Sequence, residues 1–316
     1  MTRPMITEIF IARTESLTQL PQPRNHLTGL TKKFSKILLG RWARSFVLRG
    51  YLGVPSSSIQ CYDLGMIFRS PTRLWLLPDL GMDSRLFKPQ AGHFSNLEEL
   101  PSLADHSGCE SLSEFAVRSV NRWLSEESGK SPQAKTFFLG GVGFGGILAL
   151  ELALEFASRS IYPAGVLLID STRSQATIPI SMRLKLEWLR RLPPTIAKWR
   201  LTKTFYKMTL SEGLSEANKK LLQDMVRDSD WKTFRWQVNS MLNWKRKRSE
   251  FEAGGFPIYQ LHGRGARNFC RPPVEDATLL IHGQQLINLS LPAEVNRWIE
   301  SILRDHDLRQ SQQSKA

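Results

Sequence analysis

Four glycines fall within residues 141–146 (GVGFGG), after the apolar run 137–139 and before the Ala- and Leu-rich run 147–154. A glycine turn between a strand and a helix can serve two kinds of chemistry. The spacing of Gly141, Gly143 and Gly146 is the G-x-G-x-x-G pattern that lets a backbone approach a dinucleotide pyrophosphate. Gly141 and Gly145 also match G-x-S-x-G, the turn that presents a nucleophilic serine, but Gly143 stands at the serine position.

Short apolar runs alternate with helical patterns on both sides of this turn. We expect strands in 73–77, 135–141, 164–170, 256–263 and 277–283, and helices in 111–127, 146–158 and 292–305. Apolar strands that alternate with helices are typical of a parallel sheet covered on both faces. The sequence therefore predicts an α/β fold, with a mostly parallel sheet flanked by helices.

The helix predicted at 111–127 has a defined start and an apolar face. Ser111 or Ser113 can cap its first turn, which carries Glu114. The helical period places Phe115, Val117, Val120 and either Trp123 or Leu124 inward.

The chain falls into five segments by composition. Residues 172–252 are basic, aromatic and helical in pattern, and their place before the last strands is that of a helical lid. The predicted segments are a basic N-terminal extension (1–65), the first part of the core (66–171), the lid insertion (172–252), the second part of the core (253–305) and a flexible tail (306–316).

Four segments, in this order, resemble conserved loops of the α/β-hydrolase fold superfamily, in the version of lipases and esterases. LWLLPDLGMDSRLFKPQ (74–90) resembles the oxyanion loop, and GGVGFGGILALELA (140–153) resembles the nucleophile elbow. LHGRGARNFCRPP (261–273) resembles the acid loop, and IHGQQLINLSLPAEVNRWI (281–299) resembles the histidine loop and the closing helix. The resemblance implies an α/β-hydrolase fold with an inserted helical lid.

The catalytic positions that this resemblance implies are occupied by residues unsuited to catalysis. The nucleophile position falls on Gly143, the acid position on Ala266 and the base position on Gln285. Glycine has no nucleophile, alanine cannot orient an imidazole, and glutamine takes up no proton near neutral pH. The resemblance therefore implies a degenerate triad, and we expect a pseudoenzyme rather than an active enzyme.

The elbow and the oxyanion loop fit this interpretation. A side-chain-bearing residue at the elbow costs roughly 1–3 kcal/mol of backbone strain, which Gly143 relieves. Gly141, Gly145 and Gly146 are the remaining elbow glycines. In the oxyanion loop, before Leu80, Asp79 stands where the family commonly has a small residue. A carboxylate there would oppose the negative charge that develops during acyl transfer.

Two alternatives remain open at this point. The first is an active carboxylic-ester-type hydrolase with displaced catalytic residues, for which Ser84, Asp170, Cys270 and His282 are the candidates. The second is a dinucleotide-binding protein, in which Asp170, 24 residues after Gly146, would hold a ribose.

The chain is basic, with a formal net charge of +14 and a pI of about 10.0. Basic residues concentrate in 24–50, 183–207 and 245–248, and such surfaces attract anionic partners. We therefore expect an anionic membrane surface or a protein as a partner. A small hydrophobic or acyl ligand could also bind in the cleft that holds the substrate in enzymes of this superfamily. No nucleic-acid motif accompanies the basic runs, and the sequence predicts no cofactor and no metal.

The three cysteines and the hydropathy bear on location. Cys61, Cys109 and Cys270 are isolated from one another, which fits a reducing compartment. No run reaches the roughly 18 apolar residues of a membrane span. We expect a cytoplasmic protein, with attachment to a membrane surface as the alternative.

Overall fold

The computed structural model describes residues 68, 70, 72–98, 106, 110–127, 136–211, 214–265, 277–280, 282–283 and 285–313. The chain divides into two units, Met1–Asp63 and Leu64–Ala316, and all described residues lie in the second. The predicted N-terminal extension (1–65) and all three cysteines lie outside the described residues.

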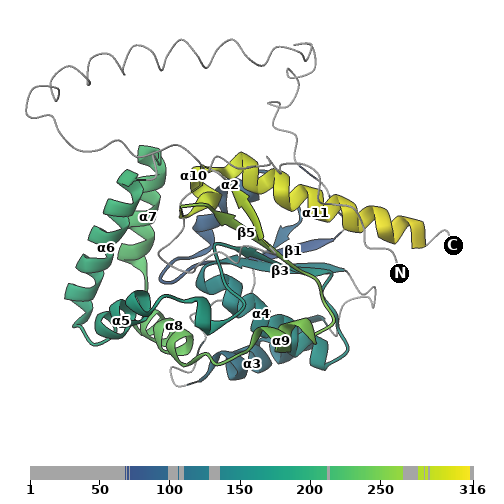
Figure 1. Cartoon of the computed structure of the whole chain (residues 1–316), viewed down its shortest axis with the longest axis horizontal. Helices are drawn as coiled ribbons and strands as arrows, with labels where there is room; N and C mark the ends of the chain where they lie inside the picture. Colours follow the sequence, from purple (N-terminus) through teal and green to yellow (C-terminus); the bar gives the residue numbers. More distant parts are fainter. Residues whose placement is uncertain are drawn as a thin grey trace, which may run out of the picture. The chain divides into compact units, whose positions relative to one another are not determined.

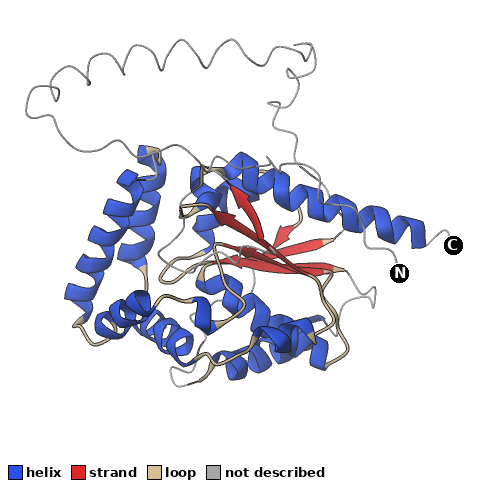
Figure 2. Cartoon of the chain, in the orientation of Figure 1, coloured by secondary structure: helices blue, strands red, loops and turns tan. Residues whose placement is uncertain are grey.

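One sheet of six strands forms the centre of the second unit, in the order β2-β1-β3-β4-β5-β6 (Figures 1 and 2). All neighbouring strands are parallel, which confirms the predicted parallel sheet. The strands are β1 (Arg73–Leu77), β2 (Leu97–Glu98), β3 (Phe137–Val142), β4 (Gly165–Ile169), β5 (Ile258–Gly263) and β6 (Ala277–Leu280).

Helices cover both faces of this sheet (Figure 2). One face carries α3 (Leu112–Glu127), α4 (Phe144–Ser158) and α9 (Arg248–Glu252), and the other carries α2 (Lys88–Ala91), α10 (Ile287–Ser290) and α11 (Pro292–Gln313). A short 3-10 helix, η1 (Ser84–Phe87), precedes α2. None of the described helices is long and apolar enough to cross a bilayer.

A helical segment lies between β4 and β5, within the residues predicted as an insertion (172–252). It contains η3 (Gln175–Thr177), α5 (Ile180–Leu189), α6 (Pro194–Ser211), α7 (Glu216–Asp228), α8 (Trp231–Asn243) and α9. The insertion is therefore helical as predicted, and its role as a lid stays a prediction.

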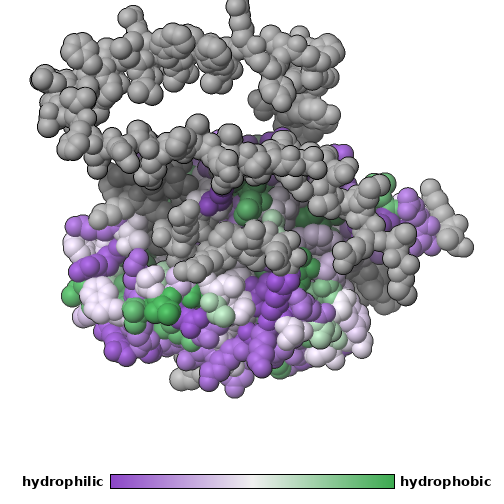
Figure 3. Space-filling view, in the orientation of Figure 1, coloured by the Kyte–Doolittle hydropathy of each residue, from purple (hydrophilic) through white to green (hydrophobic). Residues whose placement is uncertain are grey.

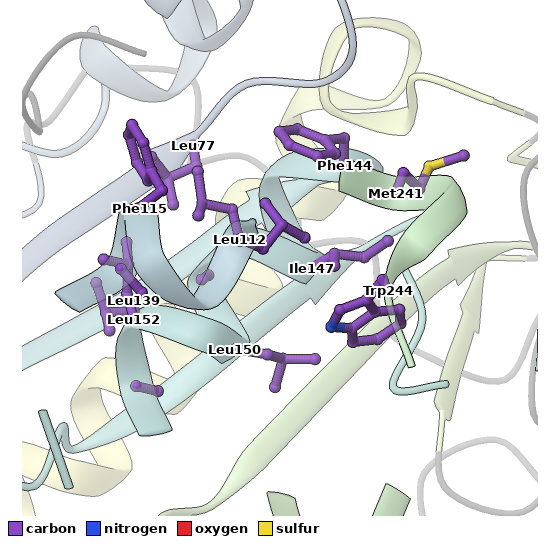
Figure 4. Close-up of a cluster of buried hydrophobic side chains, with 14 of the residues drawn as sticks. Leu77, Leu112, Phe115, Leu139, Phe144, Ile147, Leu150, Leu152, Met241 and Trp244 are labelled. Carbon is purple, nitrogen blue, oxygen red and sulfur yellow. The ribbon is translucent and has the colours of Figure 1, made fainter. Parts of the chain in front are cut away.

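The strands divide their side chains between two hydrophobic cores. Along β1, Trp75 and Leu77 enter the core under α3 and α4, and Leu74 and Leu76 enter the core under α11. This alternation follows from the period of two in a strand, and all four side chains are buried. Figure 4 shows the first core, in which Phe115 of α3 and Ile147 of α4 lie among leucines.

The helix α3 begins with the predicted cap. The Glu114 amide donates to Ser111 Oγ at 3.2 Å, and the Ser111 amide donates to the Glu114 carboxylate at 2.7 Å. This reciprocal pair is a capping box. The prediction that Val117 points inward was wrong: Val117 is 40% exposed, and Ala116 is buried instead, because α3 packs closely on α4.

The last helix is longer than the predicted helix at 292–305. α11 runs to Gln313, into the segment 306–316 that was assigned to a flexible tail. Residues 306–313 contain no glycine or proline, so nothing in the sequence interrupts the helix.

A buried carboxylate joins α4 to its neighbours. The Glu151 carboxylate accepts hydrogen bonds from Trp244 Nε1 (2.8 Å), Arg246 Nε (3.1 Å) and Ser113 Oγ (2.8 Å). A buried charge is tolerated when it is paired and hydrogen-bonded in this way. Glu151 therefore ties α3 and the chain after α8 to the core helix.

We predict that Glu151→Ala lowers the free energy of unfolding by about 3 kcal/mol, because the buried Trp244 N–H and the Arg246 guanidinium lose their acceptor. Urea unfolding measures the change. The control is Glu155→Ala, one turn further along α4, where the carboxylate pairs with Arg159 on a more accessible surface. We expect that variant to lose less than about 1 kcal/mol. Equal losses in the two variants would show that the Glu151 network adds nothing.

Candidate functional site

The carboxyl ends of β1 and β3 lie side by side in the sheet. Leu77 of β1 pairs with Gly141 of β3, so the loops after the two strands start next to each other. From β1 the chain passes to β2 on one side, whereas the later strands add on the other side. In open α/β sheets this reversal of strand order is where ligands bind. Asp79 and Gly143 both lie directly after these strand ends.

Gly143 occupies the turn between β3 and α4 with φ 53° and ψ −116°. A residue with a side chain is strained there, whereas glycine adopts these angles freely. The Gly143 amide donates to the Ile169 carbonyl at 3.0 Å, and the Gly146 amide donates to the Gly143 carbonyl at 3.2 Å. The sharp strand-to-helix turn predicted from the glycine spacing is therefore present.

The turn also brings α4 very close to the end of β1. A Cβ built on Gly145 would lie 2.6 Å from the carbonyl oxygen of Pro78, and still closer to the carbonyl of Leu77. A Cβ on Gly141 would lie 2.6 Å from the carbonyl oxygen of Gly145. Close backbone packing therefore accounts for these two glycines without any bound ligand.

The carboxylate of Asp79 fills the space above this turn. Its Oδ1 accepts a hydrogen bond from the Leu80 amide at 2.8 Å and another from the Phe144 amide at 2.8 Å. One donor follows the elbow residue and the other lies in the loop after β1, which are the two places that supply an oxyanion hole. Such donors lie 2.7–3.1 Å from an oxyanion. Here both amides donate to the chain's own carboxylate, at 2.8 Å each.

Asp79 also occupies the volume that a nucleophile would need. A Cβ built on Gly143 would lie 2.6 Å from Asp79 Oδ2 and closer still to Oδ1 and Cγ. A serine at position 143 therefore requires the Asp79 side chain to move. The glycine at 143 and the acid at 79 are therefore coupled by packing.

Burial changes the acidity of this carboxyl group. Loss of solvation raises the pKa of Asp79 from 3.8 to about 6, although the hydrogen bonds from Phe144 and Leu80 favour the charged form and lower it. The desolvation outweighs the two bonds. The carboxylate is therefore ionised at neutral pH at a cost in stability.

We predict that Asp79→Asn stabilises the protein at neutral pH. The native state holds the proton up to about pH 6 and the unfolded chain releases it near 3.8, so stability falls as pH rises between these values. We expect the variant to exceed the unmodified protein by about 2 kcal/mol in unfolding free energy at pH 7.5, and to match it at pH 4.

Urea unfolding at both pH values measures this difference. The matched control is Asp305→Asn on the exposed surface of α11, which we expect to have little effect at either pH. A gain of equal size at pH 4 and pH 7.5 would show that the Asp79 charge is not its source.

The inserted helices hold the loop that carries Asp79. The Gly81 amide donates to Gln237 Oε1 of α8 at 2.9 Å, and Gly81 has φ 68°. Asp83 then caps η1 by accepting from the Arg85 amide at 3.0 Å. Ser84, a candidate from the sequence, is exposed at the start of η1.

The structure describes only some of the predicted site residues. Gln285 lies in the loop between β6 and α10, and β6 is three strands away from β3. His282 is exposed in the turn after β6. Ala266 and Cys270 lie outside the described residues. Around the turn after β3, Asp79 contacts Leu80, Gly143 and Phe144.

A second polar pair lies at the ends of β4 and β5. Asp170, which is 5% exposed and has φ 46°, accepts from the Gly263 amide at 3.0 Å and lies 3.8 Å from His262 Nδ1. His262 is completely buried, and burial, followed by the nearby Arg173 charge, lowers its pKa to about 4. The imidazole is therefore neutral at physiological pH.

Comparisons with solved structures identify the fold. The structure matches a carboxylesterase of the thaumarchaeon Nitrososphaera gargenis (TM-score 0.55, 10% identity, 74% of this chain and 90% of that one). It also matches an esterase of Thermogutta terrifontis (0.52, 14%, 75% and 90%) and the N-acyl homoserine lactonase AidH (0.53, 14%, 74% and 89%). The chain has the α/β-hydrolase fold. A scan against protein-family models and a search of curated sequences give no match.

The structure also contains a pocket away from the turn at Gly143. Its volume is about 780 Å³, and it is lined by the start of α3, by α8 and by the residues that follow α8. Its lining combines apolar surface with polar side chains, and the polar residues include Glu110, Ser113, Glu151, Arg190, Asn239 and Arg246. Within the described part of the chain, no group of three or more His, Cys, Asp and Glu residues is placed to hold a metal ion.

Proposed function

We propose that this protein is an α/β-hydrolase-fold pseudoenzyme that acts by binding rather than by catalysis. The observation that carries the proposal is the Asp79 carboxylate. It accepts both amide hydrogens at the oxyanion position and fills the place of a nucleophile at Gly143. In the matched carboxylesterase, esterase and lactonase, this fold supports acyl chemistry. The residues at the turn after β3 of this chain are not suited to that chemistry.

Acyl transfer needs a nucleophile, a base and an oxyanion hole that is free for the transition state. Gly143 supplies no nucleophile, and Gln285 stands at the base position without a group that titrates near neutral pH. Above about pH 6 the hole contains the negative charge of Asp79, which would repel a developing oxyanion. All three requirements are unmet by the residues at the family positions.

The two alternatives have less support. For a displaced hydrolase site, the candidate His282 is exposed in the turn after β6, and Cys270 lies outside the described residues. The candidate acid Asp170 lies beside His262 instead. His262 is fully buried, with a pKa lowered to about 4, whereas a general base works best near 7. A dinucleotide would need the space over the glycine turn, which Asp79 occupies, and an available acid. Asp170 is buried and holds the Gly263 amide.

The partners expected from the sequence remain proposals. A small hydrophobic or acyl ligand in the old cleft has little support beside Asp79, since a charged carboxylate is a poor neighbour for an acyl chain. The mixed polar and apolar lining of the 780 Å³ pocket would suit a ligand that has both polar and apolar groups. The basic runs at 183–207 and 245–248 are consistent with an anionic membrane surface or a protein as a further partner.

Hydrolysis of p-nitrophenyl acetate and octanoate tests the pseudoenzyme proposal. We expect no turnover above buffer for the unmodified protein. We also expect none for the triple variant Gly143→Ser, Ala266→Asp, Gln285→His, because Asp79 still occupies the hole. Adding Asp79→Gly to the triple variant frees the hole, and loss of a single oxyanion donor already costs about 10²–10³-fold. We therefore expect at least about 100-fold more activity in the quadruple variant.

The control is the triple variant with Asp79→Asn, which removes the charge but keeps the side-chain volume. It should stay as inactive as the triple variant. Turnover by the unmodified protein, abolished by changing one serine or cysteine elsewhere, would contradict the proposal and support a displaced hydrolase site.

A further inference from the structure

Helix α5 carries an apolar stripe on its solvent side. Ile180, Leu184 and Trp188 follow one another at a spacing of four residues and are 74%, 65% and 49% exposed. Leu186 and Leu189, on the opposite side of the helix, are buried in the core. The helix is therefore apolar on two faces, and the described structure packs against only one of them.

Helix α6 extends this stripe. Ile196 and Trp199, three residues apart, are 46% and 53% exposed. The Arg200 guanidinium lies 4.9 Å from the ring centre of Trp188 and 5.9 Å from that of Trp199, so it joins the aromatic groups of the two helices. We call the resulting surface the α5–α6 patch; its apolar members are Ile180, Leu184, Trp188, Ile196 and Trp199.

The patch concentrates the exposed apolar side chains of the described structure. Nine large hydrophobic residues are exposed among the described residues, and five of them belong to the patch. Figure 3 shows hydrophobic groups, in green, surrounded by hydrophilic ones in the region that α5 occupies in Figure 1. Single exposed apolar residues are ordinary, whereas a contiguous group marks a surface that binds something.

The charges around the patch are nearly all positive. Residues 180–204 contain seven basic residues and one acidic residue. The acid, Glu187, is already engaged in ion pairs with Arg190 and Arg191, each at 2.5 Å. Lys185, Arg200 and Lys203 are exposed, and Lys203 Nζ lies 4.0 Å from the ring centre of Trp199. The surface thus presents aromatic rings bordered by cations.

We propose that the α5–α6 patch docks on the surface of an anionic phospholipid bilayer. Tryptophan rings and the stems of lysine and arginine bury an apolar body while they keep a polar end in water, as the headgroup region of a bilayer requires. Basic residues add attraction to anionic lipids. A nucleic acid would satisfy the cations but leave Ile180 and Leu184 in water, so the combination favours a membrane.

The proposal is independent of the elbow, because the patch shares no residue with the site around Asp79. A lipid surface would accept the apolar stripe and the cations together. Unlike a protein partner, it needs no groove whose shape matches the patch. Docking by this surface would place the helical insertion between the bilayer and the sheet.

Sedimentation of the full-length protein with sucrose-loaded vesicles tests the proposal. We expect binding to vesicles of phosphatidylcholine with 30 mol% phosphatidylglycerol, and at least about tenfold weaker binding to phosphatidylcholine alone. The double variant Trp188→Ala, Trp199→Ala should bind the anionic vesicles at least about tenfold more weakly. The matched control, Tyr162→Ala with Leu308→Ala, removes two equally exposed side chains outside the patch and should bind normally.

A second pair of variants tests the charges. We expect vesicle binding to weaken strongly in the double variant Lys185→Glu, Lys203→Glu. The control is the double variant Arg297→Glu, Arg309→Glu on α11, which changes the net charge by the same amount. We expect binding to weaken much less in this control. Failure of the unmodified protein to bind anionic vesicles would overturn the proposal and favour a protein partner or a second copy of the chain. Undiminished binding by the double tryptophan variant would also overturn it, since another segment would then hold the membrane.

Discussion

The local structure at the elbow depends on one interaction: the Asp79 carboxylate accepts hydrogen bonds from the Leu80 and Phe144 amides. The first amides of a helix have no partner within the helix, so the Phe144 N–H needs an external acceptor. An enzyme of this fold keeps such donors available for a transition state. Here the Asp79 side chain accepts from both donors. Asp79 and Gly143 therefore constrain each other, since the carboxylate fits only because position 143 has no side chain.

This contact depends on the sheet, which brings together two loops 65 residues apart in sequence. The parallel pairing of β1 with β3 aligns Leu77 with Gly141, and the glycines after β3 let α4 start against the end of β1. The two cores on either side of the sheet hold these strands in register. The α/β-hydrolase fold is thus complete at these strand ends, where the chain places a glycine and a carboxylate side by side.

The sequence predicted most of the fold because its signals are local. Apolar runs, the glycine turn at 141–146 and the capping residues Ser111 and Glu114 each specify an element within a few positions, and these elements are present. The position of the Asp79 carboxylate was not predictable in this way. Its partner Phe144 is distant in sequence, so spacing gave only the expectation of a repelling charge. Val117 was misplaced for a related reason, since helical period cannot tell the edge of a buried face from its centre.

The α5–α6 patch follows a different constraint from the rest of the described structure. Core residues such as Leu186 and Leu189 are apolar because burial removes them from water. Ile180 and Leu184 receive little of this benefit, because most of each side chain is exposed. Their apolar character is what the proposed docking surface requires. At the elbow the Asp79 carboxylate of the chain itself accepts from the Leu80 and Phe144 amides, whereas α5 and α6 expose apolar groups and cations to solvent. The proposed binding role of the α5–α6 patch is consistent with both observations.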